Sequence, residues 1–344
     1  MRVVTKTAVI FGGTGYLGSH VVVQLYQKGF QVILAEHPML YNHDNLVGLS
    51  DLCNGQIKLC LVNWNDENAV SNLINKNKVI DITVFAGSQY FEDVIGDSVL
   101  ASHHFHIDAA LTVFSQIEKL SNVPLVLLSS YKVYGNSTKQ YLKEDFKLLK
   151  GRLDEIELNA LTEQFTALTD LKYRLVTARL SVPIGVHESM KIGLSNESNY
   201  SEFHQRIRNS VYKGVPFSVK YKKVSGEVKS ESRDLIHVVD AAEAIACIVH
   251  HTITNPKKGN EIYNVSTNLA FPVIRFAKAL SFFSTNHFDI ENVELDAKES
   301  VITQLSNAKV VAEIGWFNKL QLIDAIKSHV AYLNESSKKL RKAA

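Results

Sequence analysis

Short apolar runs alternate along this chain with longer segments whose apolar residues recur at helical spacing. The runs are Ala8–Phe11, Gln31–Ala35, Ile57–Val62, Ile82–Phe85, Leu125–Leu128 and Arg174–Ala178, and the helical segments between them are Tyr16–Lys28, Glu67–Asn75, about 94–120 and Glu155–Thr169. Strands that alternate with helices indicate crossover units and a parallel sheet covered on both faces. The pattern predicts an α/β fold that binds its ligands at the carboxyl ends of the strands.

The pattern changes after Ala178. Pro183 and Gly185 interrupt it, and the rest reads as helices at Glu202–Lys213, Asp240–His251, Phe271–Phe283 and Leu320–Leu333, an edge-like alternating strand at Val215–Lys220 and a strand at Glu261–Val265. We therefore divide the chain into a first domain of residues 1–182, a smaller subdomain of residues 183–335 and a basic tail of residues 336–344. Residues of about 233–265 are expected to return to the first domain.

The first apolar run leads directly into a glycine-rich turn, TAVIFGGTGYLG, at Thr7–Gly18. Gly12 and Gly13 allow a tight turn, Gly15 lets a ligand approach the backbone, and Gly18 lets the following helix pack closely on the strand. That helix would direct unpaired N–H groups and the positive end of its dipole toward a pyrophosphate. The turn therefore predicts a dinucleotide site.

Glu36 ends the second apolar run, at about the place where a carboxylate binds the ribose hydroxyls of an adenosine. An acid there favours NAD over NADP, because it would repel a 2′-phosphate. The alternative interpretation is a structural glycine turn followed by a surface glutamate.

The composition excludes several classes of protein. Of 344 residues, 46% are hydrophobic and 21% charged, and the net charge is +2, so no nucleic-acid partner is indicated. No apolar run is long enough to cross a membrane, and the first is too short for a signal peptide. Cys53, Cys60 and Cys247 are too scattered for a disulfide framework or a zinc site, and no acid or cysteine accompanies the histidines at 103, 104 and 106. We expect a cytoplasmic protein without a metal.

Seven motifs, in order, resemble those of the extended short-chain dehydrogenase/reductase family, and within it the NAD-dependent sugar-nucleotide epimerases and dehydratases. They are GGTGYLGSH at 12–20, FAG at 85–87, SSYKVYG at 129–135, RLSVPIG at 179–185, RDLIHVVDAAEAI at 233–245, EIYNVST at 261–267 and EIGW at 313–316. The resemblance implies a Rossmann-type doubly wound parallel sheet with a smaller C-terminal α/β substrate subdomain. It also implies NAD as the cofactor, a nucleotide-sugar or related hydroxylated substrate, and a homodimer.

The resemblance also assigns site residues. It implies that the cofactor is bound by Gly12, Gly13, Thr14, Gly15, Tyr16, Leu17, Gly18, Glu36, Asn63, Phe85, Ala86, Gly87 and Asn159. The positions that correspond to substrate-binding residues are Gln89, Val182 and Arg233, the last as a possible phosphate contact.

The chain departs from the family at its proton-transfer residues. The family uses a Ser or Thr with a Tyr-x-x-x-Lys pair, and Ser130 keeps the first of these. Glu155 stands at the Tyr position and Asn159 at the Lys position. A glutamate is ionised at neutral pH without help from a lysine, but its side chain is shorter than tyrosine, and proton transfer requires hydrogen-bond reach. Asn159 could bond a ribose hydroxyl but supplies no positive charge.

Two interpretations of the chemistry remain open. Tyr131 and Lys132 lie where dehydratases of the family place an acidic acid/base pair, so they could form a relocated proton-transfer pair or be ordinary loop residues. Glu155 could be a new base or an exposed residue in the first turn of a helix. The sequence thus predicts either a divergent NAD-dependent enzyme or a non-catalytic NAD-binding sensor, scaffold or subunit.

Overall fold

The structure is a computed structural model of the full chain. It describes residues 5–77, 79–87, 99–120, 122–135, 141–148, 158–168, 173–194, 201–224, 227–255, 259–295 and 301–343.

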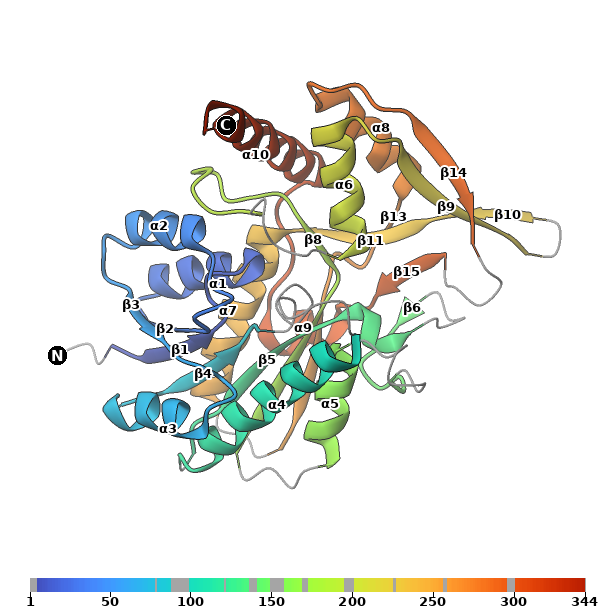
Figure 1. Ribbon diagram of the computed structural model, residues 1–344. Coiled ribbons are helices and arrows are strands. Elements are labelled where there is room, and N and C mark those ends of the chain that lie inside the picture. Colours follow the sequence, from blue (N-terminus) through green and yellow to red (C-terminus); the bar gives the residue numbers. More distant parts are fainter. Residues whose placement is uncertain are drawn as a thin grey trace.

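A parallel sheet organises the N-terminal half (Figure 1). Among the described residues it has seven strands in the order β12-β7-β5-β4-β1-β2-β3. Their bounds are β1 Thr7–Phe11, β2 Gln31–Glu36, β3 Lys58–Leu61, β4 Ile82–Phe85, β5 Leu125–Ser130, β7 Leu175–Leu180 and β12 Glu261–Val265. The winding reverses between β1 and β4, which places a ligand crevice at the carboxyl ends of these two strands. The predicted doubly wound α/β sheet is confirmed.

Helices cover both faces of this sheet. On one face lie α1 (Tyr16–Gln27), α2 (His43–Leu52) and α7 (Val238–Thr254), and on the other lie α3 (Glu67–Lys76), α4 (Val99–Glu118) and α5 (Leu158–Leu168). Each face has its own apolar core, because the sheet strands are buried on both sides.

Helix α2 is not predicted by the hydrophobic pattern. Only three of its residues, Asn45, Gly48 and Leu49, are buried, so it lacks an apolar stripe. The helix begins at Asn42, whose side chain accepts a hydrogen bond from the Asn45 N–H and caps the first turn.

Within the described ranges, two smaller sheets form the C-terminal part. One contains β6 (Tyr141–Leu142), β8 (Val182–Ile184), β11 (Ser232–His237), β13 (Ala270–Pro272) and β15 (Ile302–Leu305), and the other contains β9 (Phe217–Val224), β10 (Glu227–Ser230) and β14 (Ile290–Glu294). Helices α6 (Glu202–Lys213), α8 (Val273–Phe283) and α9 (Ala308–Ile314) accompany them. The edge-like alternation at 215–220 was misleading, because β9 lies between β10 and β14.

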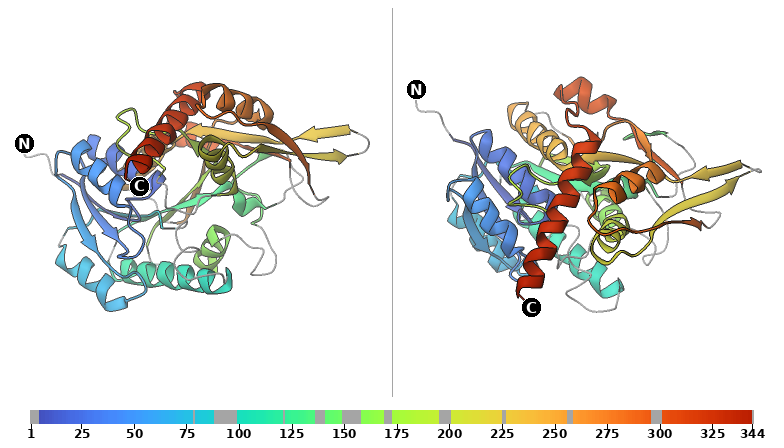
Figure 2. Two further views of the ribbon diagram at one scale, coloured as in Figure 1. Left: turned by 45° about the horizontal axis from the view of Figure 1, so that its top comes forward. Right: turned by 90° about the horizontal axis from the view of Figure 1, so that it is seen from above.

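Helix α10 (Leu322–Ala343) runs between the N-terminal sheet with its helices and the C-terminal part (Figure 2). It packs on α6, α8, β8 and β11. In the described part of the chain, neither this helix nor any other combines the length and hydropathy needed to cross a membrane. Its position brings a C-terminal element close to the first turn of α1.

Candidate functional site

The glycine-rich turn lies at the carboxyl end of β1 and leads into α1. Gly12 has a φ of 81°, which favours glycine, and a Cβ at Gly18 would lie 2.2 Å from the Gly12 carbonyl oxygen. Gly15 is the N-cap of α1. Because glycine has no side chain, the cap residue leaves the N–H groups of the first helical turn uncovered. A close-fitting backbone and an N-terminus without a side-chain cap suit a pyrophosphate.

Glu36 is held by the same turn. The Thr14 N–H donates to its Oε1 (3.0 Å), and the Thr14 hydroxyl donates to its Oε2 (2.8 Å). Burial raises the pKa of Glu36 to about 7, although hydrogen bonds from Thr14 and Gly13 lower it in part. A carboxylate offers about four acceptor sites, so these three donors leave about one for a ribose hydroxyl.

Three aromatic rings pack together beside Glu36: His37 follows β2, Trp64 follows β3 and Phe105 belongs to α4. His37 packs edge-on against Trp64 and Phe105, with ring centroids 5.8 and 5.7 Å apart. Its Nε2 lies 3.1 Å from Oδ1 of Asn63, an exposed residue, and burial lowers the pKa of the imidazole. Trp64 also restricts Gly87, because a Cβ there would lie 2.5 Å from the indole ring. The sequence identified Asn63 and Gly87 but not His37 or Trp64.

The backbone of the turn is braced by Asn45 of α2. Its amide donates to the carbonyls of Thr14 and Gly193 (both 3.0 Å), and its Oδ1 accepts the Gly193 N–H (2.9 Å). The chain after β8 therefore packs tightly on α2, where a Cβ on Gly48 would lie 2.1 Å from the Lys191 carbonyl oxygen. These braces join segments far apart in sequence, so no local pattern announces them.

Ser130 and Tyr131 lie at the carboxyl end of β5, where the backbone turns into the short helix η1 (Tyr131–Tyr134). Ser130 caps this helix by accepting the Lys132 N–H at 3.3 Å. The side chain of Tyr131 packs partly against the apolar core of the C-terminal part. Tyr131 therefore lies where the two parts of the molecule meet.

Arg233 of β11 interacts electrostatically with Tyr131. Burial alone would lower the pKa of Arg233, but Tyr131, Glu231 and Glu202 raise it overall. Its Nε donates to the Glu231 carboxylate (3.0 Å), which also binds Arg206 through both oxygens (2.8 and 2.9 Å). Its Nη1 donates to a threonine hydroxyl on β15 (2.9 Å). These bonds use two of the five guanidinium N–H groups, which leaves donors for an anionic group of a ligand.

Helix α5 is fixed by a buried ion pair. Arg179 of β7 donates to both oxygens of Glu163 (2.7 to 3.3 Å), and the Ser129 hydroxyl also donates to Glu163. The pair sets the position of Asn159, one turn earlier on α5, whose side chain is buried. Asn159 therefore has a defined place but no charge.

The other predicted residues divide into three groups. Gln89 and Glu155 lie outside the described residues. Phe85, Leu17 and Val182 contribute their side chains to apolar cores, while Ala86 bonds Phe11 through its backbone at 2.8 Å. Tyr16 donates its hydroxyl to the Gly185 carbonyl, across the boundary between the two parts of the molecule.

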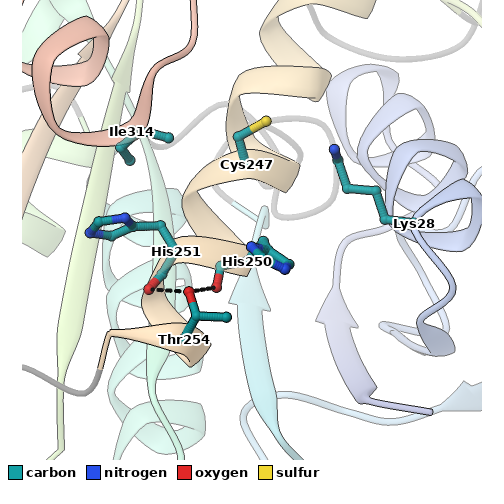
Figure 3. Close-up of a pocket in the computed structure, with 6 residues that line it drawn as sticks. All are labelled: Lys28, Cys247, His250, His251, Thr254 and Ile314. Carbon is teal, nitrogen blue, oxygen red and sulfur yellow. Dashed lines mark hydrogen bonds between the residues drawn. The ribbon is translucent and has the colours of Figure 1, made fainter. Parts of the chain in front are cut away.

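A separate cavity of about 390 Å³ lies at the opposite end of α1 (Figure 3). Its lining comes from the C-cap of α1, the second half of α7 and the end of α9, and comprises Lys28, Cys247, His250, His251, Thr254 and Ile314. Burial raises the pKa of the Cys247 thiol, which disfavours the nucleophilic thiolate. This cavity does not belong to the cofactor site, because the glycine-rich turn precedes the first turn of α1.

Three comparisons relate this chain to known proteins. The family model described as the NAD dependent epimerase/dehydratase family matches residues 8–266. A UDP-glucose 4-epimerase from Dictyostelium discoideum is 22% identical over 327 residues, covering 92% of each chain. A UDP-glucose 4-epimerase from Bacillus subtilis is 24% identical over 322 residues, covering 90% of this chain and 91% of the relative.

Solved structures share the fold. A UDP-glucose 4-epimerase from Stenotrophomonas maltophila, with bound NAD and formylated UDP-arabinopyranose, superposes with a TM-score of 0.82 at 18% identity and covers 98% of this chain and 100% of its own. The enzyme from Bifidobacterium longum, in complex with NAD+ and UDP, has a TM-score of 0.81 at 20% identity and covers 96% and 98%.

Proposed function

Because this chain belongs to the NAD-dependent epimerase/dehydratase family, we propose that it binds NAD(H) and acts on a nucleotide-sugar or related hydroxylated substrate without the family's usual Tyr/Lys pair. The relatives named above are UDP-glucose 4-epimerases, and two of the similar structures contain NAD together with UDP or a UDP-sugar. We expect the protein to be a cytoplasmic homodimer.

The glycine-rich turn carries this proposal. Gly12 and Gly18 bring the turn and α1 into close backbone contact. The N-cap residue of α1 is Gly15, so no capping side chain separates the first N–H groups of the helix from the crevice. Glu36, beside the turn, offers a carboxylate to the ribose. Bound NAD would supply a hydride acceptor or donor, while the chain binds and orients it.

The substrate part of the proposal depends on the carboxyl end of β5. Tyr131 has an exchangeable proton and lies within electrostatic range of Arg233, which is suited to bind a diphosphate. Ser130 immediately precedes it and could hydrogen-bond a sugar hydroxyl. We propose that Tyr131 moves the proton that the family assigns to a tyrosine on α5.

Asn159 favours a second candidate, a non-catalytic NAD-binding sensor, scaffold or subunit. Its side chain is buried on α5, at the position that we assign to the family's lysine, and it cannot supply a positive charge to a nearby base. A protein of this kind would bind NAD(H) and would show no turnover of nucleotide-sugars.

Nucleotide analysis and turnover assays separate these candidates. Any nucleotide released by denaturing the purified protein is identified by mass, and NAD(H) and NADP(H) are then titrated into the emptied protein. We expect NAD binding, and turnover of a nucleotide-sugar that falls at least about 100-fold in Tyr131→Phe. The matched control is Tyr221→Phe, a tyrosine that bonds Glu294 on β14. NAD binding without turnover of any nucleotide-sugar would favour the sensor, and no binding of either nucleotide would reject both candidates.

The variant Glu36→Gln is expected to weaken NAD binding about tenfold and to reduce the preference for NAD over NADP. The amide has only one acceptor oxygen, so either the N–H or the hydroxyl of Thr14 loses its partner, and the negative charge that would repel a 2′-phosphate is removed. Both dissociation constants are measured by titration calorimetry. The control is Glu67→Gln, an exposed acid on α3. An unchanged NAD-to-NADP ratio in Glu36→Gln would reject this role for the carboxylate.

A further inference from the structure

A cluster of buried histidines surrounds Tyr16 where the glycine-rich turn meets the C-terminal part. Five separate segments contribute one ring each: His20 from α1, His187 from the chain after β8, His204 from α6, His237 from the end of β11 and His329 from α10. All five are at most 9% exposed. We call this set the histidine cluster.

The rings pack on one another and on Tyr16. The Tyr16 ring lies edge-on to His20, His204 and His329, with centroids 5.6, 5.7 and 6.4 Å away. His204 stacks on His329 at 6.1 Å, and His20 lies 6.4 Å from His187. The histidine cluster thus forms much of the contact between the start of α1 and the C-terminal part.

Hydrogen bonds to the backbone assign one neutral tautomer to each of three rings. The Nδ1 of His329 accepts the Gly185 N–H (3.1 Å), so it carries no proton. The Nε2 of His204 donates to the Pro183 carbonyl (2.7 Å), and the Nδ1 of His20 donates to the Tyr16 carbonyl (2.7 Å). A proton added to Nδ1 of His329 would turn this acceptor into a donor that points at the Gly185 N–H, so the bond between His329 and Gly185 would break.

The surroundings disfavour charge on these rings. Burial lowers the pKa of His20 and His329 to about 3 and that of His204 and His237 to about 4. The charged groups that face the cluster are few: Lys132 acts against protonation of His204, while Glu188 favours protonation of His187 and Asp324 that of His237.

A metal does not explain the cluster. In the described ranges, no group of three or more His, Cys, Asp or Glu side chains is arranged to hold a metal ion. One nitrogen each of His329 and His204 is instead bonded to the backbone, at the Gly185 N–H and the Pro183 carbonyl.

We propose that the histidine cluster is an acid-sensitive latch, closed while its rings are neutral and released when they are protonated. Closure joins α10 to Gly185 through His329 and Gly185 to α1 through the Tyr16 hydroxyl. Because Tyr16 directly follows Gly15, release would loosen the proposed cofactor site in acid. The latch itself goes beyond the proposed function, since its contacts join only groups of this chain.

Hydrogen exchange at the Gly185 and Val186 amides tests the latch directly. The Gly185 N–H bonds His329 and the Val186 N–H bonds Ser328 (3.3 Å), so both amides become exchangeable when the cluster opens. Exchange is measured on the full chain without nucleotide at pH 7 and pH 5.5, and protection factors are corrected for the intrinsic rate. Each ring released should lower protection roughly tenfold between these pH values, because the open form binds protons that the closed form does not.

The variant His329→Asn provides the decisive comparison. Asparagine can accept the Gly185 N–H through its oxygen but does not titrate, so the loss of protection in acid should shrink by roughly tenfold. The control is His250→Asn, an exposed histidine on α7. If His329→Asn does not fold, His204→Gln serves instead, because its amide can donate to the Pro183 carbonyl. Three results would overturn the latch. The Gly185 and Val186 amides could be equally protected at both pH values, they could lose as much protection in acid in His329→Asn as in the wild type, or the β1 amides could lose as much protection in acid as they do.

These measurements are independent of nucleotide binding. Glu36 titrates in a similar range, but its partner is Thr14, so its protonation leaves the Gly185 bond unchanged. A protein that fails to bind NAD but shows the acid-dependent exchange would reject the proposed function and retain the latch.

Discussion

Replacement of Gly18 by alanine is expected to weaken NAD binding at least about 100-fold, or about 2.7 kcal/mol. The new Cβ would lie 2.2 Å from the Gly12 carbonyl oxygen and 3.0 Å from the Gly13 Cα, and both neighbours are backbone atoms that cannot rotate away. The turn must therefore move relative to α1, and the N–H groups at the start of that helix no longer meet a pyrophosphate held by the turn. Titration calorimetry with NAD measures the loss.

The control for this prediction is Gly29→Ala. Gly29 has a φ of 84°, and a Cβ added there would have no atom within 4 Å, so alanine adds backbone strain without a clash. We expect Gly29→Ala to lose about 1 kcal/mol of stability and to keep its affinity for NAD. Wild-type affinity in Gly18→Ala would show that this turn does not bind the cofactor.

Lowering the pH from 7.5 to 5 is expected to reduce the free energy of unfolding by about 4 kcal/mol. The pKa values of His20, His204, His237 and His329 lie at about 3 to 4 in the folded protein, below the ordinary value of 6.5. The unfolded chain therefore binds more protons than the folded protein once the pH falls below 6.5. Each of these rings then costs about 2 kcal/mol at pH 5, and the loss continues down to the folded pKa.

Two buried acids act in the opposite direction. Burial raises the pKa of Glu36 to about 7 and that of Asp234 to about 6, so the folded state takes up protons there and gains about 4 kcal/mol between pH 7.5 and pH 5. The histidines outnumber these acids, and the net effect of acid is destabilising.

Urea unfolding followed by tryptophan fluorescence measures this prediction, since Trp64 and Trp316 are both buried. The double variant with His204→Gln and His329→Asn removes two titrating rings, each of which costs about 2 kcal/mol at pH 5, so it should lose little or no stability in acid. Equal unfolding midpoints for the wild type at pH 7.5 and pH 5 would contradict the assignment of neutral, buried imidazoles.

Much of the fold could be predicted from the sequence because its signals are local. The strand at Ala8–Phe11 and the helix at Tyr16–Lys28 show their periods directly, and a parallel sheet buried on both faces requires such apolar runs. Helix α2 was missed because an asparagine cap and packing against Lys191 stabilise it rather than an apolar stripe. The place of β9 between two other strands was missed because its second neighbour, β14, comes from a distant part of the chain.

The sequence by itself determined the sheet and the glycine-rich turn with Glu36, because each depends on residue type and spacing along the chain. The replacement of the usual Tyr/Lys pair by Glu155 and Asn159 stays a prediction from the sequence. Only the tertiary structure decided that Thr14 holds Glu36, that Arg233 interacts electrostatically with Tyr131, and that His20, His204 and His329 gather around Tyr16. The physical reason is distance along the chain. Burial and neighbouring charges set the protonation of a side chain, and for these groups most of the neighbours come from segments tens to hundreds of residues away.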